Sequence, residues 1–187
     1  MIEFKNTCFS YGETQVLKNF NLTVNDGDRI CLFGNSGIGK TTVLRLILGL
    51  EKASDNSVKC CYKNASAVFQ EDRLLPFKTA KENISLFTGC DDCDDILRGL
   101  DIFEARDKYP SQLSGGMLRR VSIARALCAD ADLYILDEPF TGLDYDNISR
   151  ASELINKITK GKTVISVLHE ERHAQLLSCK IIDMKNP

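Results

Sequence analysis

The sequence lacks any long hydrophobic run and any excess of charge of one sign. No stretch approaches the roughly 18 apolar residues that a membrane-spanning helix needs, and the best candidate, residues 43–50, is short and contains Arg45. The formal net charge is -2 at pH 7, whereas chains that coat nucleic acid or an anionic membrane are strongly basic. We therefore expect a soluble protein that spans no membrane and binds no nucleic acid.

Targeting signals, internal repeats, low-complexity segments and Pro/Gly-rich linkers are also lacking. Residues 1–5 alternate apolar and polar side chains where a secretory signal needs an apolar run. The four prolines are scattered. With 187 residues, the chain can bury the core of one domain but is too short for two of ordinary size. We expect a single domain over residues 1–187, located in the cytoplasm.

Eight cysteines are present, a number that would suit a disulfide framework in a small secreted protein. Four of them lie in apolar runs, where a reduced thiol behaves as a small core residue: Cys31, Cys60, Cys61 and Cys128. Cys90 and Cys93 have the spacing of a metal-binding pair, but no second pair lies nearby to complete four ligands. We favour reduced thiols of a cytosolic protein over a metal site.

Hydrophobic patterns predict strands and helices in alternation. Residues 2–6 and 22–24 alternate as antiparallel strands closed by a turn at 25–28. Residues 29–33 and 133–136 are short apolar runs typical of buried strands. Further strands are predicted at 58–62, 66–69, 163–168 and 180–184, and helices at 41–50, 95–103, 116–128 and 144–160, with a capping box at 79–82.

This order of elements predicts an α/β fold with a central, mostly parallel sheet. An antiparallel β subdomain precedes the sheet, and a helical subdomain is inserted at about residues 75–130. Parallel sheets bind ligands in the loops that follow the carboxyl ends of their strands. The motifs that lie in such loops are therefore the candidates for chemistry.

The strongest motif follows the predicted strand at 29–33 and precedes a predicted helix, as a phosphate-binding loop requires. It matches G-x-x-x-x-G-K-[ST] and runs Gly34-Asn35-Ser36-Gly37-Ile38-Gly39-Lys40-Thr41-Thr42. Glycines let successive amide groups turn toward phosphate oxygens, and the helix N-terminus adds partial positive charge. We expect Lys40 to reach the β- and γ-phosphates of a nucleotide and the Thr41 hydroxyl to bind Mg²⁺. The alternative is a glycine-rich turn with an exposed lysine.

A second motif places two carboxylates after the predicted strand at 133–136. Asp137 would hold Mg²⁺, directly or through water, and Glu138 can orient or deprotonate an attacking water. On its own this pair could be an acidic helix cap. Beside residues 34–42 it predicts a P-loop ATPase.

A third motif begins a long predicted helix with a serine and two glycines: Ser114, Gly115, Gly116 and Met117. Serine is a good N-cap, and the glycines expose free amide groups, so this turn is either a second anion site or simply a capped helix. Residues 113–127 closely resemble the signature region of ATP-binding cassette (ABC) ATPases. The resemblance implies that this turn closes over ATP bound to a second ATPase subunit.

The same resemblance covers nearly the whole chain and assigns further roles. It implies that Tyr11 stacks on adenine, that Gln70 senses Mg²⁺ and the attacking water, and that His169 contacts the γ-phosphate. The loop at 141–144, ending at Asp144, would cross the dimer interface. The chain departs from the family at Met117, where glutamine is common, and we expect activity to survive because the backbone donors remain.

The type of ABC protein follows from what surrounds the motifs. The 97 positions from Lys40 to Asp137 leave no room for the coiled coil of repair ATPases. A lone cassette implies a separate membrane permease, and residues 70–77 with Met117 resemble the nitrate, sulfonate and taurine importer group. We expect ATP-driven import on the inner face of the membrane with a solute-binding protein in the system. The alternative is a soluble repair or assembly ATPase.

The same importer-like run contains an apolar segment, Leu74, Leu75 and Phe77 around Pro76. We expect it to present a patch to the permease. The alternative is that these side chains pack under the helical subdomain.

Overall fold

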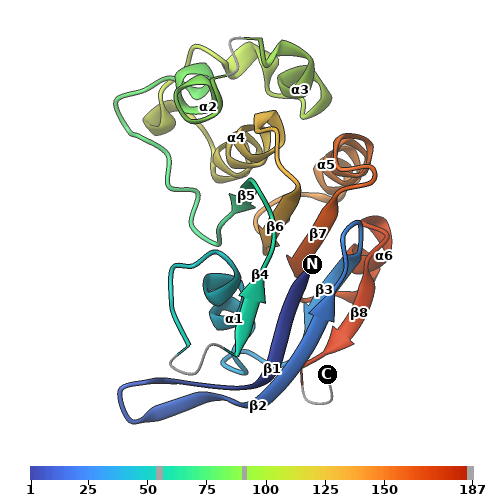
Figure 1. Ribbon diagram of the computed structural model, residues 1–187. Helices are drawn as coiled ribbons and strands as arrows, with labels where there is room; N and C mark the ends of the chain where they lie inside the picture. The colour runs from blue at the N-terminus through green and yellow to red at the C-terminus, as the bar shows by residue number, and fades with distance from the viewer. Residues whose placement is uncertain (54–56, 90–91, 185–187) are drawn as a thin grey trace.

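Two sheets and a set of helices make up the computed structural model (Figure 1), which describes residues 1–53, 57–89 and 92–184. The strands are β1 (Ile2–Tyr11), β2 (Thr14–Val24), β3 (Arg29–Phe33), β4 (Val58–Cys60), β5 (Ala65–Val68), β6 (Leu133–Asp137), β7 (Thr163–Val167) and β8 (Lys180–Asp183). The α-helices are α1 (Lys40–Ile47), α2 (Ala80–Thr88), α3 (Asp94–Gly99), α4 (Gly115–Cys128), α5 (Tyr145–Ile158) and α6 (Glu171–Leu176). Two 3₁₀ turns, η1 (Phe103–Ala105) and η2 (Pro110–Gln112), separate α3 from α4.

The larger sheet is parallel and has the strand order β5-β6-β7-β3-β8. Every residue of β6 and β7 is buried, which is why these strands are nearly continuous apolar runs in the sequence. β7 lies between β3 and β6, so the loops that follow these three strands open at one edge of the sheet. The predicted α/β fold with a parallel sheet is confirmed.

The smaller sheet is antiparallel, in the order β2-β1-β4, and here two boundaries were predicted wrongly. The hairpin turns at Gly12, where φ is 57° and Tyr11 pairs with Thr14, and not at residues 25–28. The latter turn leads from β2 into β3. Register shifts between Phe4 and Ser10 disturb the alternation of side chains, which hid the length of both strands from the sequence pattern.

The helices between residues 80 and 128 gather at one end of the sheet, away from α1 (Figure 1). Thr79 and Glu82 form the predicted capping box of α2. The helix predicted at 95–103 stops at Gly99 because Asp101 adopts a left-handed backbone with φ 54°. Helix α6 was not predicted, since its six residues are too few to show an apolar period.

The cysteines divide between core and surface. Cys31 is fully buried as expected, whereas Cys60 and Cys61 are exposed. The prediction was wrong for these two because Cys60 ends β4, an edge strand of the smaller sheet, and Cys61 lies beyond that strand. Cys90, one of the two cysteines with the spacing of a metal-binding pair, lies outside the described residues, so the preference for reduced thiols over a metal site stays a prediction there. No helix in the described ranges has the length and hydropathy needed to cross a bilayer.

Candidate nucleotide-binding site

The loop between β3 and α1 ends at a glycine whose position leaves little room for a side chain. Gly39 is the N-cap of α1 and has a left-handed backbone with φ 106°. A Cβ at this position would lie 2.8 Å from Leu17 Cδ2 and 3.1 Å from Val16 Cγ1. Gly39 therefore lets the loop pass close to β2 while the free amide groups of the α1 N-terminus point back toward the loop.

Lys40 supplies a buried positive charge to the same loop. The residue is only 7% exposed. Its Nζ donates hydrogen bonds to the carbonyl oxygens of Gly34, at 2.7 Å, and Asn35, at 3.0 Å. The ammonium group is thus held over the loop, together with the α1 N-terminus, which is a suitable arrangement for binding phosphate.

Thr41 and Asp137 bring oxygen atoms together beside this loop. Thr41 Oγ1 donates to Asp137 Oδ2 at 3.5 Å. Asp137 is 4% exposed, and its Oδ1 is buried without a hydrogen-bond partner among the described residues. Burial raises the pKa of this carboxyl, and the neighbouring charge of Glu138 raises it further. A hydroxyl next to a buried carboxylate oxygen that lacks a partner fits Mg²⁺, which prefers hard oxygen ligands.

Glu138 and His169 form the closest side-chain pair of the site. His169 Nε2 lies 2.7 Å from Glu138 Oε1, and His169 follows β7 while Glu138 follows β6. Glu138 has φ 50°, and its amide donates to the carbonyl of Val167 at 3.0 Å. A left-handed non-glycine residue costs on the order of 1–3 kcal/mol and is found most often at functional sites. The Glu138 carboxylate thus lies against His169 at a point where its own backbone is strained.

Gln70 and Tyr11 are at the surface, and no contact in the described structure links them to Lys40 or Glu138. Gln70 is exposed, while its backbone carbonyl is held by Arg119 at 2.6 Å. Tyr11 is 43% exposed and packs edge-on against Phe9, with ring centroids 5.0 Å apart. Both side chains are therefore accessible to a ligand.

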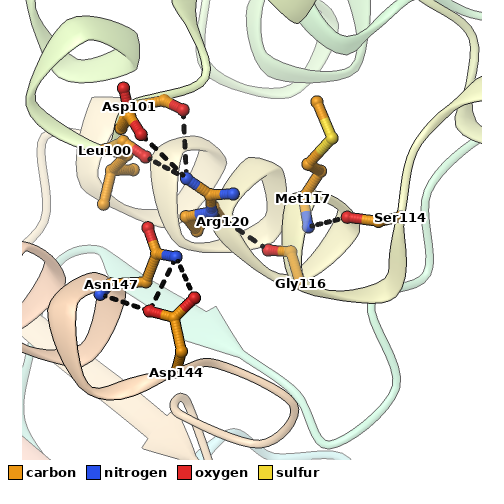
Figure 2. Close-up of polar contacts among 8 residues, drawn as sticks. All are labelled: Leu100, Asp101, Ser114, Gly116, Met117, Arg120, Asp144 and Asn147. Carbon is orange, nitrogen blue, oxygen red and sulfur yellow. Dashed lines mark hydrogen bonds and ion pairs between the residues drawn. The ribbon is translucent and has the colours of Figure 1, made fainter.

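The Ser114 turn is separate from the phosphate loop. Ser114 Oγ accepts a hydrogen bond from the Met117 amide at 3.3 Å and caps α4 (Figure 2). A Cβ at Gly116 would lie 3.2 Å from the Gly142 carbonyl, whereas a Cβ at Gly115 would meet nothing within 4 Å. No hydrogen bond or ion pair of the described residues joins this turn to residues 34–42. It packs instead on the loop that leads to Asp144.

Asp144 is the N-cap of α5 and accepts hydrogen bonds from the backbone and side chain of Asn147, each at 2.9 Å. These bonds lower the pKa of the Asp144 carboxyl.

A cavity of about 350 Å³ lies between the loop that leads to Asp144 and His169, and Glu138 lines it. A larger cavity of about 510 Å³ lies at the amino-terminal ends of the strands and contains none of the predicted site residues.

Two arginines of α4, Arg119 and Arg125, lie within the signature region, and the sequence predicted no role for them. Arg119 is 3% exposed and bonds to the loop that contains Gln70. Arginine is rarely buried without partners. The position of Arg119 on the apolar face of a predicted helix was the sequence signal that could have identified this residue.

Comparisons with known proteins agree on one family. The family model described as "ABC transporter" matches residues 17–141. The arginine transport ATP-binding protein ArtM of Bacillus subtilis is 31% identical over 98% of this chain and 87% of its own length. The aliphatic sulfonates import ATP-binding protein SsuB of Corynebacterium glutamicum is 35% identical over 92% and 75%. The bicarbonate transport ATP-binding protein CmpD of a Synechocystis strain is 35% identical over 94% and 69%.

Solved structures with the same fold include the dimeric structure of MJ0796, described as a bacterial ABC transporter cassette. It is 28% identical and has a TM-score of 0.82, and the match covers 100% of this chain and 96% of that structure's chain. A post-hydrolysis dimer of that cassette bound to ADP and phosphate is 29% identical, with a TM-score of 0.81 over 98% of this chain and 94% of the other.

Proposed function

This chain belongs to the family of ABC transporter ATP-binding proteins, and we propose that residues 34–42 with Asp137, Glu138 and His169 form its ATP-hydrolysing site. The protein is an ATP-binding subunit that uses MgATP and hydrolyses it to power transport. The observation that best supports this site is that three loops, which follow β3, β6 and β7, converge at one edge of the sheet.

Each residue of the site has a physical role in this proposal. The amide groups of residues 34–42 and the Lys40 ammonium hold the β- and γ-phosphates of ATP, and Tyr11 stacks on adenine. Asp137, Thr41 and Gln70 hold Mg²⁺. Mg²⁺, when bound, neutralises the charge on the phosphate oxygens. Its fit rests on the buried Asp137 Oδ1, which has no other partner.

Glu138 orients the attacking water and accepts its proton in this proposal. The strained backbone fixes its carboxylate, and the contact with His169 prevents that carboxylate from rotating freely. His169 is 56% exposed at its side chain, which leaves it accessible to the γ-phosphate. Gln70 completes the site from the loop that follows β5.

The site needs a second subunit. The Ser114 turn offers amide groups but packs against its own Asp144 loop, and no polar contact in the described structure joins it to residues 34–42. We propose that two copies, or this chain and a related ATPase subunit, pair head to tail, as cassettes of this family form dimers. The turn of each subunit, with Ser114, Gly115, Gly116 and Met117, then covers ATP on the other. Asp144 would lie at that interface.

The proposed membrane partner is a separate permease that contacts the region around α2. Phe77, just before α2, and Leu86 and Phe87, near its end, are apolar side chains that are 69%, 59% and 60% exposed. Leu74 instead packs against the core, so only part of the patch expected from residues 74–77 is available. We propose that residues 1–187 form one ATPase domain whose helical subdomain, about residues 75–130, faces this permease.

The proposed transport direction is import, the direction that the name of the sulfonate relative gives. The proposal includes a solute-binding protein in the system and places the ATPase on the inner face of the membrane. Two of the relatives are named for the transport of bicarbonate and of aliphatic sulfonates, which are both oxyanions, and an oxyanion is our choice for this chain. Copurification of the chain with its permease, followed by assay of solute uptake, tests this assignment.

The test of the two-subunit site uses Glu138→Gln, which removes the general base but keeps the shape of the side chain. The variant should bind ATP, hydrolyse it at least about 100-fold more slowly, and accumulate as a dimer in size-exclusion chromatography with ATP. Adding Gly115→Glu places an anion against the phosphate and should return the protein to monomer. Lys157→Glu, at an exposed position near the end of α5, also adds a negative charge, is the control, and should leave the dimer intact. A monomeric Glu138→Gln variant that hydrolyses ATP normally would disprove the site.

A further inference from the structure

The backbone of the loop after β5 is bonded at several points to the signature helix. This Gln70 loop, residues 69–73, carries the glutamine proposed to bind Mg²⁺, and α4 begins at the Ser114 turn. Arg119 Nη1 donates to the carbonyl of Phe69 at 2.6 Å, and its Nη2 donates to the carbonyl of Gln70 at 2.6 Å. One guanidinium therefore holds two successive carbonyls of the loop.

Arg125, two turns further along α4, continues the same pattern. Its Nη2 donates to the carbonyl of Asp72 at 2.8 Å, and its Nη1 donates to the carbonyl of Arg73 at 3.0 Å. The Asp72 carboxylate also lies 3.1 Å from Arg119 Nη1. Two arginines on one helix thus donate hydrogen bonds to four carbonyls of the Gln70 loop, and one of them forms an ion pair with the Asp72 carboxylate.

The loop is held in a conformation that it would not keep alone. Arg73 has a left-handed backbone with φ 46°, which is costly for a residue with a long side chain. Its guanidinium stacks over the Phe69 ring at 4.8 Å and so closes the loop on itself. A strained segment of this kind persists only where surrounding contacts determine it, and here the contacts come from α4.

The Arg119 bonds are also well protected. Arg119 is 3% exposed, so its bonds form in a region of low effective dielectric where charge-assisted hydrogen bonds are strong. Removing the guanidinium would leave two carbonyls and a partly buried carboxylate without their donor. A lysine could satisfy one of the carbonyls but cannot replace the fixed fork of an arginine.

We propose that Arg119 is a positioning residue for Gln70, and that Arg119 and Arg125 join the signature helix to the Gln70 loop as one rigid unit. The inference rests on the proposed function, in which the Ser114 turn contacts ATP on the partner subunit while Gln70 serves the ATP of its own subunit. A displacement of α4 on closure of the dimer then moves Gln70 directly. In this arrangement, a movement of the Ser114 turn reaches the Gln70 loop through four arginine nitrogens, four carbonyl oxygens and one carboxylate oxygen.

The test compares Arg119→Lys with Arg150→Lys, a control at an exposed arginine of α5. Arg119→Lys should raise the rate of amide hydrogen exchange in residues 69–73 and leave exchange in residues 34–42 unchanged. It should lower the turnover rate about 10-fold to 100-fold, as expected for a misplaced catalytic group, and raise the Mg²⁺ concentration needed for half-maximal activity. ATP affinity without Mg²⁺ should stay within about twofold of the parent, because the Lys40 loop is intact.

Gln70→Ala separates this inference from the proposed function. If Arg119 acts through Gln70, adding Arg119→Lys to Gln70→Ala should lower turnover by less than about twofold beyond Gln70→Ala alone. The positioning role would be overturned if the losses of turnover in the two single variants multiplied in the double variant. It would also be overturned if Arg119→Lys left hydrogen exchange in residues 69–73 unchanged. If Gln70→Ala is fully active while Arg119→Lys raises hydrogen exchange in residues 69–73, then Arg119 holds the Gln70 loop but Gln70 has no catalytic role. Arg125→Lys should reproduce the exchange effect more weakly, since Arg125 is partly exposed.

Discussion

Helices α1 and α4 both begin at glycine-rich turns, and the two turns are built in opposite ways. At α1 the N-cap is Gly39, which has no side chain to cap the helix and lies where a Cβ would collide with Leu17. At α4 the N-cap is Ser114, whose hydroxyl caps the helix, and a Cβ at Gly115 would meet open space. The first turn is enclosed by its own subunit, and the second is open to solvent.

The two turns also differ in charge, since only the enclosed α1 turn contains a charged residue. Lys40 brings a buried ammonium to the α1 turn, and Asp137 lies beside Thr41. The first turn of α4 contains no charged residue, and the guanidinium of Arg119 points away from it onto the Gln70 loop. The α1 turn therefore contains the groups needed to hold a phosphate and its metal. The α4 turn has only backbone donors, which suits a ligand delivered by another subunit.

The largest expected effect comes from removing the charge of the enclosed turn. Lys40→Ala should lower ATP hydrolysis at least about 100-fold and weaken nucleotide binding, because preorganised charge at the phosphates is lost. Turnover and nucleotide affinity measure this directly. Lys52→Ala, at an exposed lysine, is the control and should behave as the parent. Normal turnover in Lys40→Ala would mean that the α1 turn does not bind the phosphates.

The next comparison exchanges a hydrogen for a methyl group in each turn. Gly39→Ala forces a left-handed alanine against Leu17 and should lower the free energy of unfolding by about 1–3 kcal/mol. Gly115→Ala should change it by less than about 0.5 kcal/mol, since the new methyl group faces open space. Urea denaturation of the two variants side by side measures the difference. Equal losses would show that the two turns are not built differently.

Asp137→Asn tests whether the enclosed turn keeps a carboxylate at a cost to stability. Burial raises the folded-state pKa of Asp137 above its ordinary value of 3.8. The folded protein thus holds this proton to a higher pH than the unfolded chain, and stability falls as pH rises from 3.8 through the folded pKa. Without metal or nucleotide, Asp137→Asn should therefore gain stability relative to the parent across that window, and the gain should be constant above it. Hydrolysis should be lost.

Urea denaturation of parent and Asp137→Asn proteins over a pH series, with EDTA present, measures the gain. Asp146→Asn, on the exposed side of α5, is the control and should show no comparable trend. A variant that is less stable than the parent at every pH would mean that Asp137 has a stabilising partner in the metal-free protein.

The sequence predicted the enclosed turn better than the contacts around it. The spacing from Gly34 to Thr42 predicted the loop, because phosphate binding by backbone amides depends on local chain geometry. The contact of Gly39 with Leu17 was not predictable, since it depends on how a separate hairpin packs. The same holds for the strained backbone of Glu138 and the bonds of Arg119 to the Gln70 loop. Hydrophobic periodicity identified the long helices and buried strands but missed the six residues of α6.

The smallest expected effect concerns the cap of the open turn. Ser114 Oγ accepts one bond from the Met117 amide at 3.3 Å, in a turn that water can also reach. Ser114→Ala should therefore lower the free energy of unfolding by about 0.5–1 kcal/mol, at the low end for helix caps. Thr79→Ala, which breaks the capping box of α2, is the matched control and should cost at least as much.

The two cap variants should rank in the opposite order when ATP-dependent dimerisation, rather than stability, is measured. Because Ser114 aligns the free amide groups at the start of α4, Ser114→Ala in the Glu138→Gln background should raise the ATP concentration needed for dimerisation about threefold to tenfold. Thr79→Ala should leave it unchanged, since α2 begins away from the proposed interface. Size-exclusion chromatography over an ATP series measures both variants. Equal shifts would mean that general loss of stability, rather than the Ser114 turn, controls dimer formation.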